Sequence, residues 1–360
     1  MMRAALALAR RSLGRTWPNP AVGCVIVKDG KIVGRGRTRD GGRPHAEVDA
    51  LAQAGELARG ATVYVTLEPC SHHGKSPPCA DALVKAGVAR VVSAMQDPYP
   101  KVDGQGHARL RAAGIEVEVG EGAEEAAEIN AGFLMHVRES RPLFHLKLGM
   151  SLDGRIATAS GESKWITSEA ARAQTHRLRA THDAILVGIG TALADNPDLT
   201  CRLPGLAAYS PVRVILDSKA RLPPESLLAR TARTAPVWLL CTSSAPMASR
   251  EALKVQGVEI IEVAASVAGR VDIAMAARAL GQRNLTSVLV EGGGEVAAAF
   301  LKAGLVDRLT IHRGGRLLGG DGRSAVGALG LDRLDFAPRF TLLSTRVAGG
   351  DTLETWRRAA

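Results

Sequence analysis

The stretch "EPCSHHGKSPPC", residues 68–79, brings two cysteines and two histidines into one short loop. Thiolates and imidazoles are ligands that zinc prefers, and Cys79 stands where a short helix should begin, which favours its thiolate form. The stretch "PHAEVDA" supplies a further imidazole, His45, at the start of the preceding predicted helix. A catalytic zinc site uses three side chains and a water, whereas a structural site uses four side chains. The pattern therefore predicts a catalytic zinc ion bound by His45, Cys70 and Cys79.

Glu47 follows His45 by two positions, so it lies near the predicted metal without being an obvious ligand. A carboxylate placed there can carry protons for the water that zinc activates, which makes Glu47 the predicted catalytic residue. The alternative is a closed structural site in which His72 or His73 is the fourth ligand. That alternative leaves Glu47 without a role.

The order His-Ala-Glu, Pro-Cys and a second cysteine resembles the zinc-dependent cytidine-deaminase-like superfamily, whose signature is H-x-E followed by P-C-x-x-C. Here eight residues instead of two separate the cysteines. With "PNPAVGCVIV" upstream, this longer loop resembles the deaminase half of the bifunctional riboflavin-biosynthesis deaminase/reductase family. The resemblance implies that Asn19 hydrogen-bonds the pyrimidine and that His72 and Lys75 reach toward the ribose phosphate. An ordinary turn at Asn19 and a solvated Lys75 are the alternatives.

In the second half of the chain, "SVLVEGGGEVAAAFLKAG" is typical of a strand, a glycine-rich turn and a helix. The backbone N–H groups of Gly293, Gly294 and the first helical turn predict a phosphate-binding nest at the positive end of the helix dipole. The turn lacks the G-x-G-x-x-G fingerprint of a Rossmann site, and a plain flexible turn is the alternative. The stretches "KLGMSLDGRIATASGESKWIT", "VGIGTALADNPDLTCR" and "RVILDS" resemble the dihydrofolate-reductase-like half of the same bifunctional family.

That resemblance implies an NADPH-dependent reductase. Its cofactor-binding residues would be Gly149, Trp165, Thr191, Asp195, Ser218, Gly293, Gly294, Glu295, Val296, Ala297, Ala298 and Ala299. Its substrate-binding residues would be Ser163, Arg179, Leu199, Arg202 and Glu291. The forked donors of Arg179 and Arg202 suit a phosphomonoester, although a solvated helix face is the alternative for Arg179. Lys147 and Glu291, each at a predicted strand end, suit polarisation of the ribose and proton transfer. Trp165 can equally be a buried anchor for its loop.

The elements that must position these residues alternate along most of the chain. "AVGCVIV" and "KIVGRG" flank Asp29-Gly30, a two-residue hairpin signal, and helix–strand units follow with Gly55 and Gly87 as predicted helix ends. This order predicts a largely parallel sheet with helices on its faces. Seven further apolar runs, beginning with "FHLKLGM" and ending with "LTIH", predict a second α/β sheet.

The charged "RES" and Pro142 predict a domain boundary, which gives a zinc-dependent deaminase domain over residues 1–142 and a reductase domain over residues 143–360. By resemblance, the first is a cytidine-deaminase-like three-layer α/β domain and the second a dihydrofolate-reductase-like α/β domain. The implied activity has two steps in riboflavin synthesis. They are hydrolytic deamination of 2,5-diamino-6-(5-phosphoribosylamino)pyrimidin-4-one and NADPH-dependent reduction of its ribosyl side chain to ribityl.

Composition limits the possible partners. The chain has 360 residues, a formal net charge of +10 and only 3% aromatic residues. Because its arginines are scattered and few aromatic rings can stack on bases, we expect an anionic small substrate rather than nucleic acid. A nucleic-acid deaminase with an appended domain is the rival class, and a non-catalytic zinc scaffold is another.

No apolar stretch approaches the length of a membrane span, and "MMRAALALARRSLG" predicts an amphipathic helix rather than a signal peptide. Five cysteines, an odd number, argue against a disulfide framework. We therefore expect a cytoplasmic enzyme without membrane contact, and a homo-oligomer, most simply a dimer.

Overall fold

The computed structural model describes residues 1–74 and 77–359, so Lys75 lies outside the described residues. The chain divides into two compact units, Met1–Ser140 and Arg141–Ala360. The boundary predicted from the sequence, at residue 142, lies beside this division. Within the described residues, no helix combines the length and the apolar character needed to cross a lipid bilayer.

The first unit is built on a five-stranded sheet with the order β2-β1-β3-β4-β5. Its strands are β1 (Gly23–Lys28), β2 (Lys31–Arg37), β3 (Thr62–Val65), β4 (Arg90–Ser93) and β5 (Glu116–Val119). β1 pairs antiparallel with β2 and β3, whereas β3, β4 and β5 run parallel. Asp29 and Gly30 have φ values of 49° and 74°, as a tight hairpin turn between β1 and β2 requires. The predicted hairpin is confirmed.

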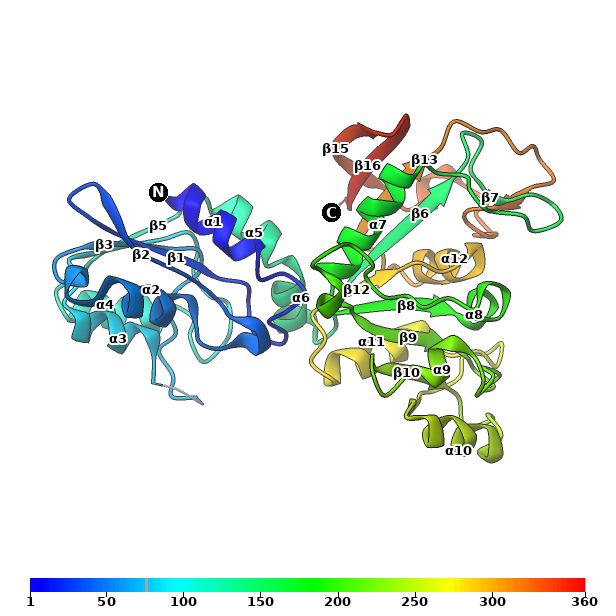
Figure 1. Cartoon of the computed structure of the whole chain (residues 1–360), viewed down its shortest axis with the longest axis horizontal. Coiled ribbons are helices and arrows are strands. Elements are labelled where there is room, and N and C mark those ends of the chain that lie inside the picture. The colour runs from blue at the N-terminus through cyan, green and yellow to red at the C-terminus, as the bar shows by residue number, and fades with distance from the viewer. Residues whose placement is uncertain (75–76, 360) are drawn as a thin grey trace. The chain divides into compact units, whose positions relative to one another are not determined.

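Helices cover both faces of this sheet (Figure 1). One face carries α2 (Ala46–Ala54), α3 (Cys79–Ala86) and α4 (Gln105–Ala112), and the other carries α1 (Met2–Arg10) and α5 (Ala123–Ile129), which α6 (Ala131–Glu139) follows. Successive β1 side chains serve opposite layers: Cys24 and Ile26 pack in the core with α2 and α3, and Val25 packs with α1 and α5. This alternation produces the three-layer α/β arrangement that the sequence predicted.

The second unit contains a nine-stranded sheet with the order β11-β10-β9-β8-β12-β6-β13-β16-β15. Its strands are β6 (Leu143–Met150), β8 (Ala184–Gly188), β9 (Val212–Leu216), β10 (Val237–Cys241), β11 (Glu259–Glu262), β12 (Ser287–Val290), β13 (Arg308–Arg313), β15 (Phe340–Ala348) and β16 (Asp351–Arg358). A separate small sheet pairs β7 (Arg155–Ala157) with β14 (Arg323–Ser324). The strands from β11 to β13 are parallel, and the hairpin β15–β16 continues the sheet antiparallel.

The α-helices that connect or cover these strands are labelled in Figure 1. They are α7 (Glu169–Ala180), α8 (Ile189–Asp195), α9 (Leu227–Arg230), α10 (Met247–Gln256), α11 (Ile273–Gln282) and α12 (Gly294–Lys302). All seven strands predicted from apolar runs are present, and β8 is buried at every residue, as a central parallel strand should be. The hairpin β15–β16 was not predicted. Nearly all of β15 is exposed, so its sequence shows neither an apolar run nor a buried alternation.

The helix α7 is tied to the sheet beneath it by buried histidines. His145 Nδ1 lies 3.1 Å from His182 Nε2, and His145 Nε2 lies 2.7 Å from the hydroxyl of Thr310 on β13. Farther along, the Thr175 hydroxyl lies 3.4 Å from His312 Nδ1. These contacts fix α7 across β6 and β13, next to the carboxyl ends of the parallel strands. Ligands of open α/β sheets bind at this edge.

Candidate active sites

Three predicted metal ligands meet at the beginnings of two helices in the first unit. His45 is the N-cap residue of α2, Cys79 is the first residue of α3, and Cys70 lies in the loop after β3. His45 Nδ1 lies 3.3 Å from Cys79 Sγ and 3.6 Å from Cys70 Sγ. Within residues 1–74 and 77–359, no other His, Cys, Asp or Glu joins this cluster, and neither His72 nor His73 belongs to it.

Local packing brings His45 to this place. Gly36 on β2 lies under the first turn of α2, where a Cβ atom would come within 2.0 Å of the carbonyl oxygen of Ala46. A side chain at position 36 would therefore push the start of α2, and His45 with it, away from the sheet. At α3 the Cys79 backbone N–H donates to Cys70 Sγ at 3.2 Å, which joins the cysteine loop to the helix start.

The two thiols of the cluster differ in their protonation. The hydrogen bond with Cys79 lowers the pKa of the Cys70 thiol to about 4, and His45 lowers it further. Burial opposes this shift but does not outweigh it. The same hydrogen bond and burial raise the pKa of Cys79. Before a metal binds, Cys70 is therefore the thiolate and Cys79 keeps its proton. The expectation that the helix start favours the Cys79 thiolate is not met, because the hydrogen bond with Cys70 and burial outweigh the effect of the helix end. Two thiols and one imidazole that converge on a single point form a donor set suited to Zn²⁺.

Glu47 lies in the first turn of α2 and is only 4% exposed. Burial, with a contribution from the nearby Cys70 charge, raises the pKa of its carboxyl to about 7. A carboxyl group that titrates near neutral pH can both accept and release a proton. The position and pKa of Glu47 therefore suit the proton transfer that the sequence predicted for it.

A second carboxylate organises the loop beside the cysteines. Glu68 is fully buried and accepts hydrogen bonds of 2.8–3.1 Å from the backbone N–H groups of four residues: Asp97, Gly104, Gly106 and His107. This carboxylate fixes the segment 96–107 near Cys70. In that segment, burial and then the charges of Glu68 and Cys70 raise the pKa of Asp97 to about 6. Asp97 was not predicted from the sequence, because "QDPYP" alone is no more than a turn signal.

The other residues predicted for the first site are less constrained. Asn19 packs against Gly42, where a Cβ atom would come within 2.1 Å of Asn19 Nδ2. The His72 ring lies 6.0 Å from the Tyr99 ring, and its Nδ1 is buried without a partner in the described part of the chain. The contacts of both residues to a substrate stay predictions, and the prediction for Lys75 falls outside the described residues.

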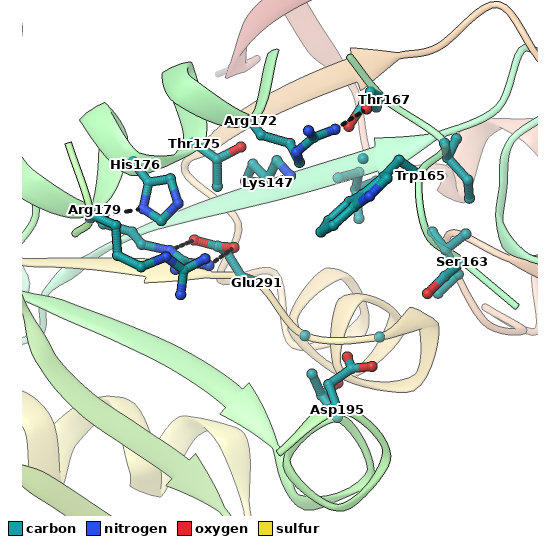
Figure 2. A pocket seen from close by; sticks show the side chains of 18 residues that line it. Lys147, Ser163, Trp165, Thr167, Arg172, Thr175, His176, Arg179, Asp195 and Glu291 are labelled. Carbon is teal, nitrogen blue, oxygen red and sulfur yellow. Dashed lines mark hydrogen bonds and ion pairs between the residues drawn. The ribbon is translucent and has the colours of Figure 1, made fainter. Parts of the chain in front are cut away.

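The second unit holds a cavity of about 340 Å³ beside β6, α7, α8 and the turn after β12. Ten residues predicted for the reductase site line it: Lys147, Gly149, Ser163, Trp165, Arg179, Thr191, Asp195, Arg202, Glu291 and Gly293. Figure 2 shows Arg179, His176 and Glu291 gathered at one end, and Trp165 and Ser163 at the other. The structure therefore gathers residues from separate stretches of the sequence, between Lys147 and Gly293, around one cavity.

The remaining predicted residues do not line this cavity. Ser218 follows β9, and its hydroxyl accepts the N–H of Val271 at 2.9 Å. Leu199 is 4% exposed and belongs to the apolar core. The other predicted residues all lie on α12: Gly294, Glu295, Val296, Ala297, Ala298 and Ala299. The α12 residue nearest in sequence to the cavity lining is Gly294, which follows the N-cap residue Gly293. Direct contacts from these residues to a cofactor stay predictions.

The three glycines in the turn after β12 have different surroundings. A Cβ atom on Gly292 would come within 2.6 Å of Val296, and one on Gly294 within 2.6 Å of the Ser324 carbonyl oxygen. Gly293 has open space around it, with only the Thr191 hydroxyl at 3.8 Å. The backbone of Gly293, at the positive end of α12, thus borders the cavity. This arrangement fits the phosphates of a dinucleotide such as NADPH.

Arg179 and Glu291 form a two-pronged ion pair at one end of the cavity. Arg179 Nε and Nη2 donate to the two Glu291 carboxylate oxygens at 2.8 and 2.9 Å, and Nη1 donates to the Thr200 carbonyl at 3.1 Å. Burial opposes ionisation of Glu291, but Arg179 overcomes that effect and lowers the pKa of the carboxyl. Glu291 is therefore a carboxylate at neutral pH. Most of the Arg179 guanidinium is already engaged with it.

Lys147 lines the cavity beside this pair, is half-buried, and has no hydrogen-bond partner among the described residues. Burial lowers the pKa of its ammonium group, Glu291 raises it, and Arg179 lowers it further. Arg172 lies over the Trp165 ring, 4.2 Å from its centre, and so braces this exposed indole. Three α7 residues in the cavity were missed: Arg172, Thr175 and His176. Their helical spacing from Arg179 is the signal that could have found them.

Two family models match the chain, one in each unit. Residues 142–353 match the model of the RibD C-terminal domain, and residues 1–95 match that of the cytidine and deoxycytidylate deaminase zinc-binding region. The chain belongs to the RibD family. The riboflavin biosynthesis protein RibD of Escherichia coli K12 is 46% identical over 97% of this chain and 96% of its own length. That of Aquifex aeolicus VF5 is 41% identical over 93% of this chain and 91% of its own length.

Two solved structures extend the RibD likeness to three dimensions. A structure of Acinetobacter baumannii RibD is 41% identical, with a TM-score of 0.88 over 100% of this chain and 98% of that one. A Thermotoga maritima diaminohydroxyphosphoribosylaminopyrimidine deaminase/5-amino-6-(5-phosphoribosylamino)uracil reductase is 36% identical, with a TM-score of 0.86 over 99% of this chain and 97% of that one. RibD membership confirms the predicted fold class, the bifunctional deaminase/reductase of riboflavin biosynthesis, and the cofactors Zn²⁺ and NADPH.

Proposed function

We propose that the first unit deaminates 2,5-diamino-6-(5-phosphoribosylamino)pyrimidin-4-one and that the second unit reduces the ribosyl side chain of the product with NADPH. The observation that carries this proposal is the presence of two separate sets of reactive groups. One set is His45, Cys70 and Cys79 with Glu47, and the other is Lys147, Arg202 and Glu291 beside the turn at Gly293.

The residues of the first site suit hydrolytic deamination. Zn²⁺ held by His45, Cys70 and Cys79 would supply Lewis acidity and lower the pKa of a water. Glu47 accepts the proton that the attacking water gives up and delivers it to the departing amino group, so that oxygen replaces nitrogen at C2 and ammonia leaves. The pKa of about 7 allows Glu47 to perform both transfers.

The residues of the second site suit reduction of an opened ribose. NADPH bound beside Gly293 would supply the hydride for C1′. The ring opens when the bond between C1′ and O4′ breaks, which leaves a carbon–nitrogen double bond at C1′ and requires a proton on O4′. Lys147 lines the cavity and has no hydrogen-bond partner among the described residues, and we assign it as the donor to O4′, because Glu291 is held ionised by Arg179. The Glu291 carboxylate in turn stabilises the protonated Lys147.

Arg202 is the main phosphate ligand in this proposal. Its side chain lines the cavity, is exposed, and makes no hydrogen bond within the described residues. A guanidinium with its fork free can bind a phosphomonoester through two parallel hydrogen bonds. Arg179 is bonded to Glu291 and contributes its positive charge to this end of the cavity.

One experiment tests the two-step proposal. The purified protein is incubated with the diaminopyrimidine substrate, with and without NADPH, and the products are identified by mass. We expect the deaminated ribosyl compound without NADPH and the deaminated ribityl compound with it. Reduction without prior deamination, or no mass change in either mixture, contradicts the proposal.

We also propose that the protein is a homodimer joined through β15. This strand forms the edge of the nine-stranded sheet and exposes three apolar side chains: Leu342 (47%), Leu343 (40%) and Val347 (75%). An exposed apolar edge strand is a template for pairing with a second chain. Light scattering should give twice the mass of one chain, and Val347→Lys should shift the protein toward the monomer. A monomeric wild-type protein at micromolar concentration would contradict this proposal.

We propose further that the protein does not use nucleic acid and acts in the cytoplasm. Much of the positive charge is locally neutralised, for example in the pairs Arg39–Asp49 and Arg109–Asp81. All five cysteines are unpaired, which suits a reducing compartment. A purified sample should show no nucleic-acid absorbance at 260 nm and no salt-dependent RNA binding. Cell fractionation should recover the activity in the cytoplasm.

A further inference from the structure

His176 occupies the Arg179 end of the reductase cavity and has no role in the reaction described above. It lies one helical turn before Arg179 on α7, and Figure 2 shows its ring between Arg179 and Lys147. Its Nδ1 accepts the backbone N–H of Arg202 at 3.2 Å. Because Nδ1 is an acceptor here, the proton of the neutral ring is on Nε2. His176 therefore fixes the Arg202 backbone and keeps one N–H donor for a ligand.

This end of the cavity needs a further donor if it binds a phosphate dianion. Two Arg179 nitrogens are bound to Glu291 and the third is bound to Thr200. Arg202 remains as the one arginine there with a free fork among the described residues lining the cavity. His176 is the polar side chain at this end that accepts a hydrogen bond from the Arg202 backbone.

On the basis of the proposed function, we propose that His176 is a substrate-binding residue: it donates from Nε2 to the substrate phosphate and takes up a proton when the dianion binds. The contact from Nδ1 to the Arg202 amide couples the two groups, so that the imidazole and the guanidinium close on the same phosphate.

The surroundings of His176 keep it neutral before the phosphate arrives. Burial, then Arg179 and Arg202, lower its pKa, while Glu291 and the Thr200 carbonyl raise it. The other charged groups that line the cavity are Lys147, Arg172 and Asp195, and His312 lies buried behind Thr175. A dianion held beside the ring adds negative charge and so favours the imidazolium form. Binding should therefore draw a proton from the buffer.

The test is calorimetric titration of the full-length protein with ribose 5-phosphate at pH 7, in two buffers of different ionisation enthalpy. The Arg202→Ala variant identifies the heat that belongs to the reductase cavity. His176→Gln can accept from the Arg202 amide and donate to the phosphate but cannot take up a proton. His176→Leu removes both hydrogen bonds, and its melting temperature shows whether it is folded.

We expect the wild type to take up a fraction of a proton more than His176→Gln, while the two bind with similar Kd at pH 8. The phosphate titrates identically in both proteins, so the difference isolates His176. His176→Leu should bind about 10-fold more weakly or worse, the scale of a lost hydrogen bond to a charged group. Equal proton uptake by the wild type and His176→Gln, or unchanged affinity in folded His176→Leu, overturns this inference and leaves the proposed reaction standing. If no heat is sensitive to Arg202→Ala, both this inference and the phosphate assignment fail.

Discussion

Two buried glutamates in this chain are tuned in opposite directions. Glu47 has no cationic side chain paired with it in the described structure, and burial raises its pKa to about 7. Glu291 is largely buried, with 11% of its side chain exposed, and is bonded to Arg179, which holds its pKa below the ordinary value. The first can exchange protons at neutral pH, whereas the second remains a fixed negative charge. The environment thus gives the same side chain two different functions.

Replacement of Glu47 by Gln tests the first of these functions. The amide has nearly the same size and lies outside the metal cluster, so zinc should be retained. Deamination should fall by about 10²–10⁴-fold, because the group that moves the proton is lost. Metal analysis and a deaminase assay measure the two effects. Unchanged turnover would show that another group carries the proton.

Replacement of Cys70 by Ser tests the metal cluster. A hydroxyl is a poorer zinc ligand than a thiolate, and the hydrogen bonds with Cys79 and His45 would be altered. We expect loss of most of the bound zinc and of deamination, together with a looser cysteine loop, because metal binding and local folding are linked. Metal analysis by mass spectrometry is the readout. A Cys70→Ser protein that retains one equivalent of zinc and full deamination refutes the ligand assignment.

At the scale of elements, Glu68 holds together a loop that has little secondary structure. In Glu68→Gln the amide group would face backbone N–H donors that a carboxylate now satisfies. The loss should be about 2 kcal/mol or more, which corresponds to roughly 30-fold faster hydrogen exchange across residues 96–107. Exchange in β8 of the second unit provides the internal control. Unchanged protection of the loop would show that other contacts hold it.

The buried histidines between α7 and the sheet make the second unit sensitive to acid. Burial and then the Lys147 charge lower the pKa of His312 to about 3, below its unfolded value of about 6.5. The unfolded chain therefore binds the additional proton below pH 6.5. The stability contributed by neutral His312 is complete above that pH and falls by about 1.4 kcal/mol per pH unit down to about pH 3.

Urea denaturation at pH 6.5 and pH 5.0 measures this effect. Between these two pH values, the free energy of unfolding of His312→Gln should fall by about 2 kcal/mol less than that of the wild type, because the glutamine cannot take up a proton in the unfolded chain. Buried His145 and His182, whose pKa values are also lowered by burial, should still contribute a slope in the variant. Parallel pH dependences of wild type and variant would contradict the assignment to His312.

The sequence predicted elements well where local signals are strong. The hairpin at Asp29-Gly30, the helix ends at Gly55 and Gly87, and the seven strands predicted from apolar runs in the second unit are all present. The exposed strand β15 was missed, because pairing with β16 and not a pattern of its own defines it. Local turn chemistry and apolar runs can be read directly from sequence, whereas an edge strand depends on its neighbour.

The same limit applies to the sites. The metal cluster was predicted because helix starts place His45 and Cys79, and a short loop places Cys70. The engagement of Arg179 with Glu291, 112 positions away, was not predicted. Neither was the contact between His176 and the Arg202 backbone. These contacts depend on how α7 packs against strands that are remote in sequence, and residue types alone do not reveal it.

At the scale of the whole molecule, the two activities should be separable. The metal cluster lies within Met1–Ser140 and the cavity within Arg141–Ala360. Glu47→Gln should therefore still reduce an already deaminated substrate with NADPH. Arg202→Ala should weaken substrate binding in the reductase by about 1.5–3 kcal/mol, the scale of a lost hydrogen bond to a charged group, while deamination persists.

Both variants are assayed with the same two pyrimidines, so each serves as the control for the other. Loss of deamination with intact reduction in Arg202→Ala would reverse the assignment of the two units. Loss of both activities in folded Glu47→Gln would show that the sites are coupled.

The strand order has a consequence for biosynthesis of the protein. In the first unit, β1 finds its partner β3 within about forty positions, since Cys24 pairs with Val65. In the second unit, β6 is made first, yet its neighbour β12 pairs Ser287 with Leu143. At roughly 5–20 residues per second, a ribosome needs about 7–30 s to supply that partner. During this interval the apolar strand "LFHLKLGM" is outside the exit tunnel but has no β12 to pair with. Chaperone capacity during translation, rather than final stability, should therefore limit the yield of soluble protein at high expression.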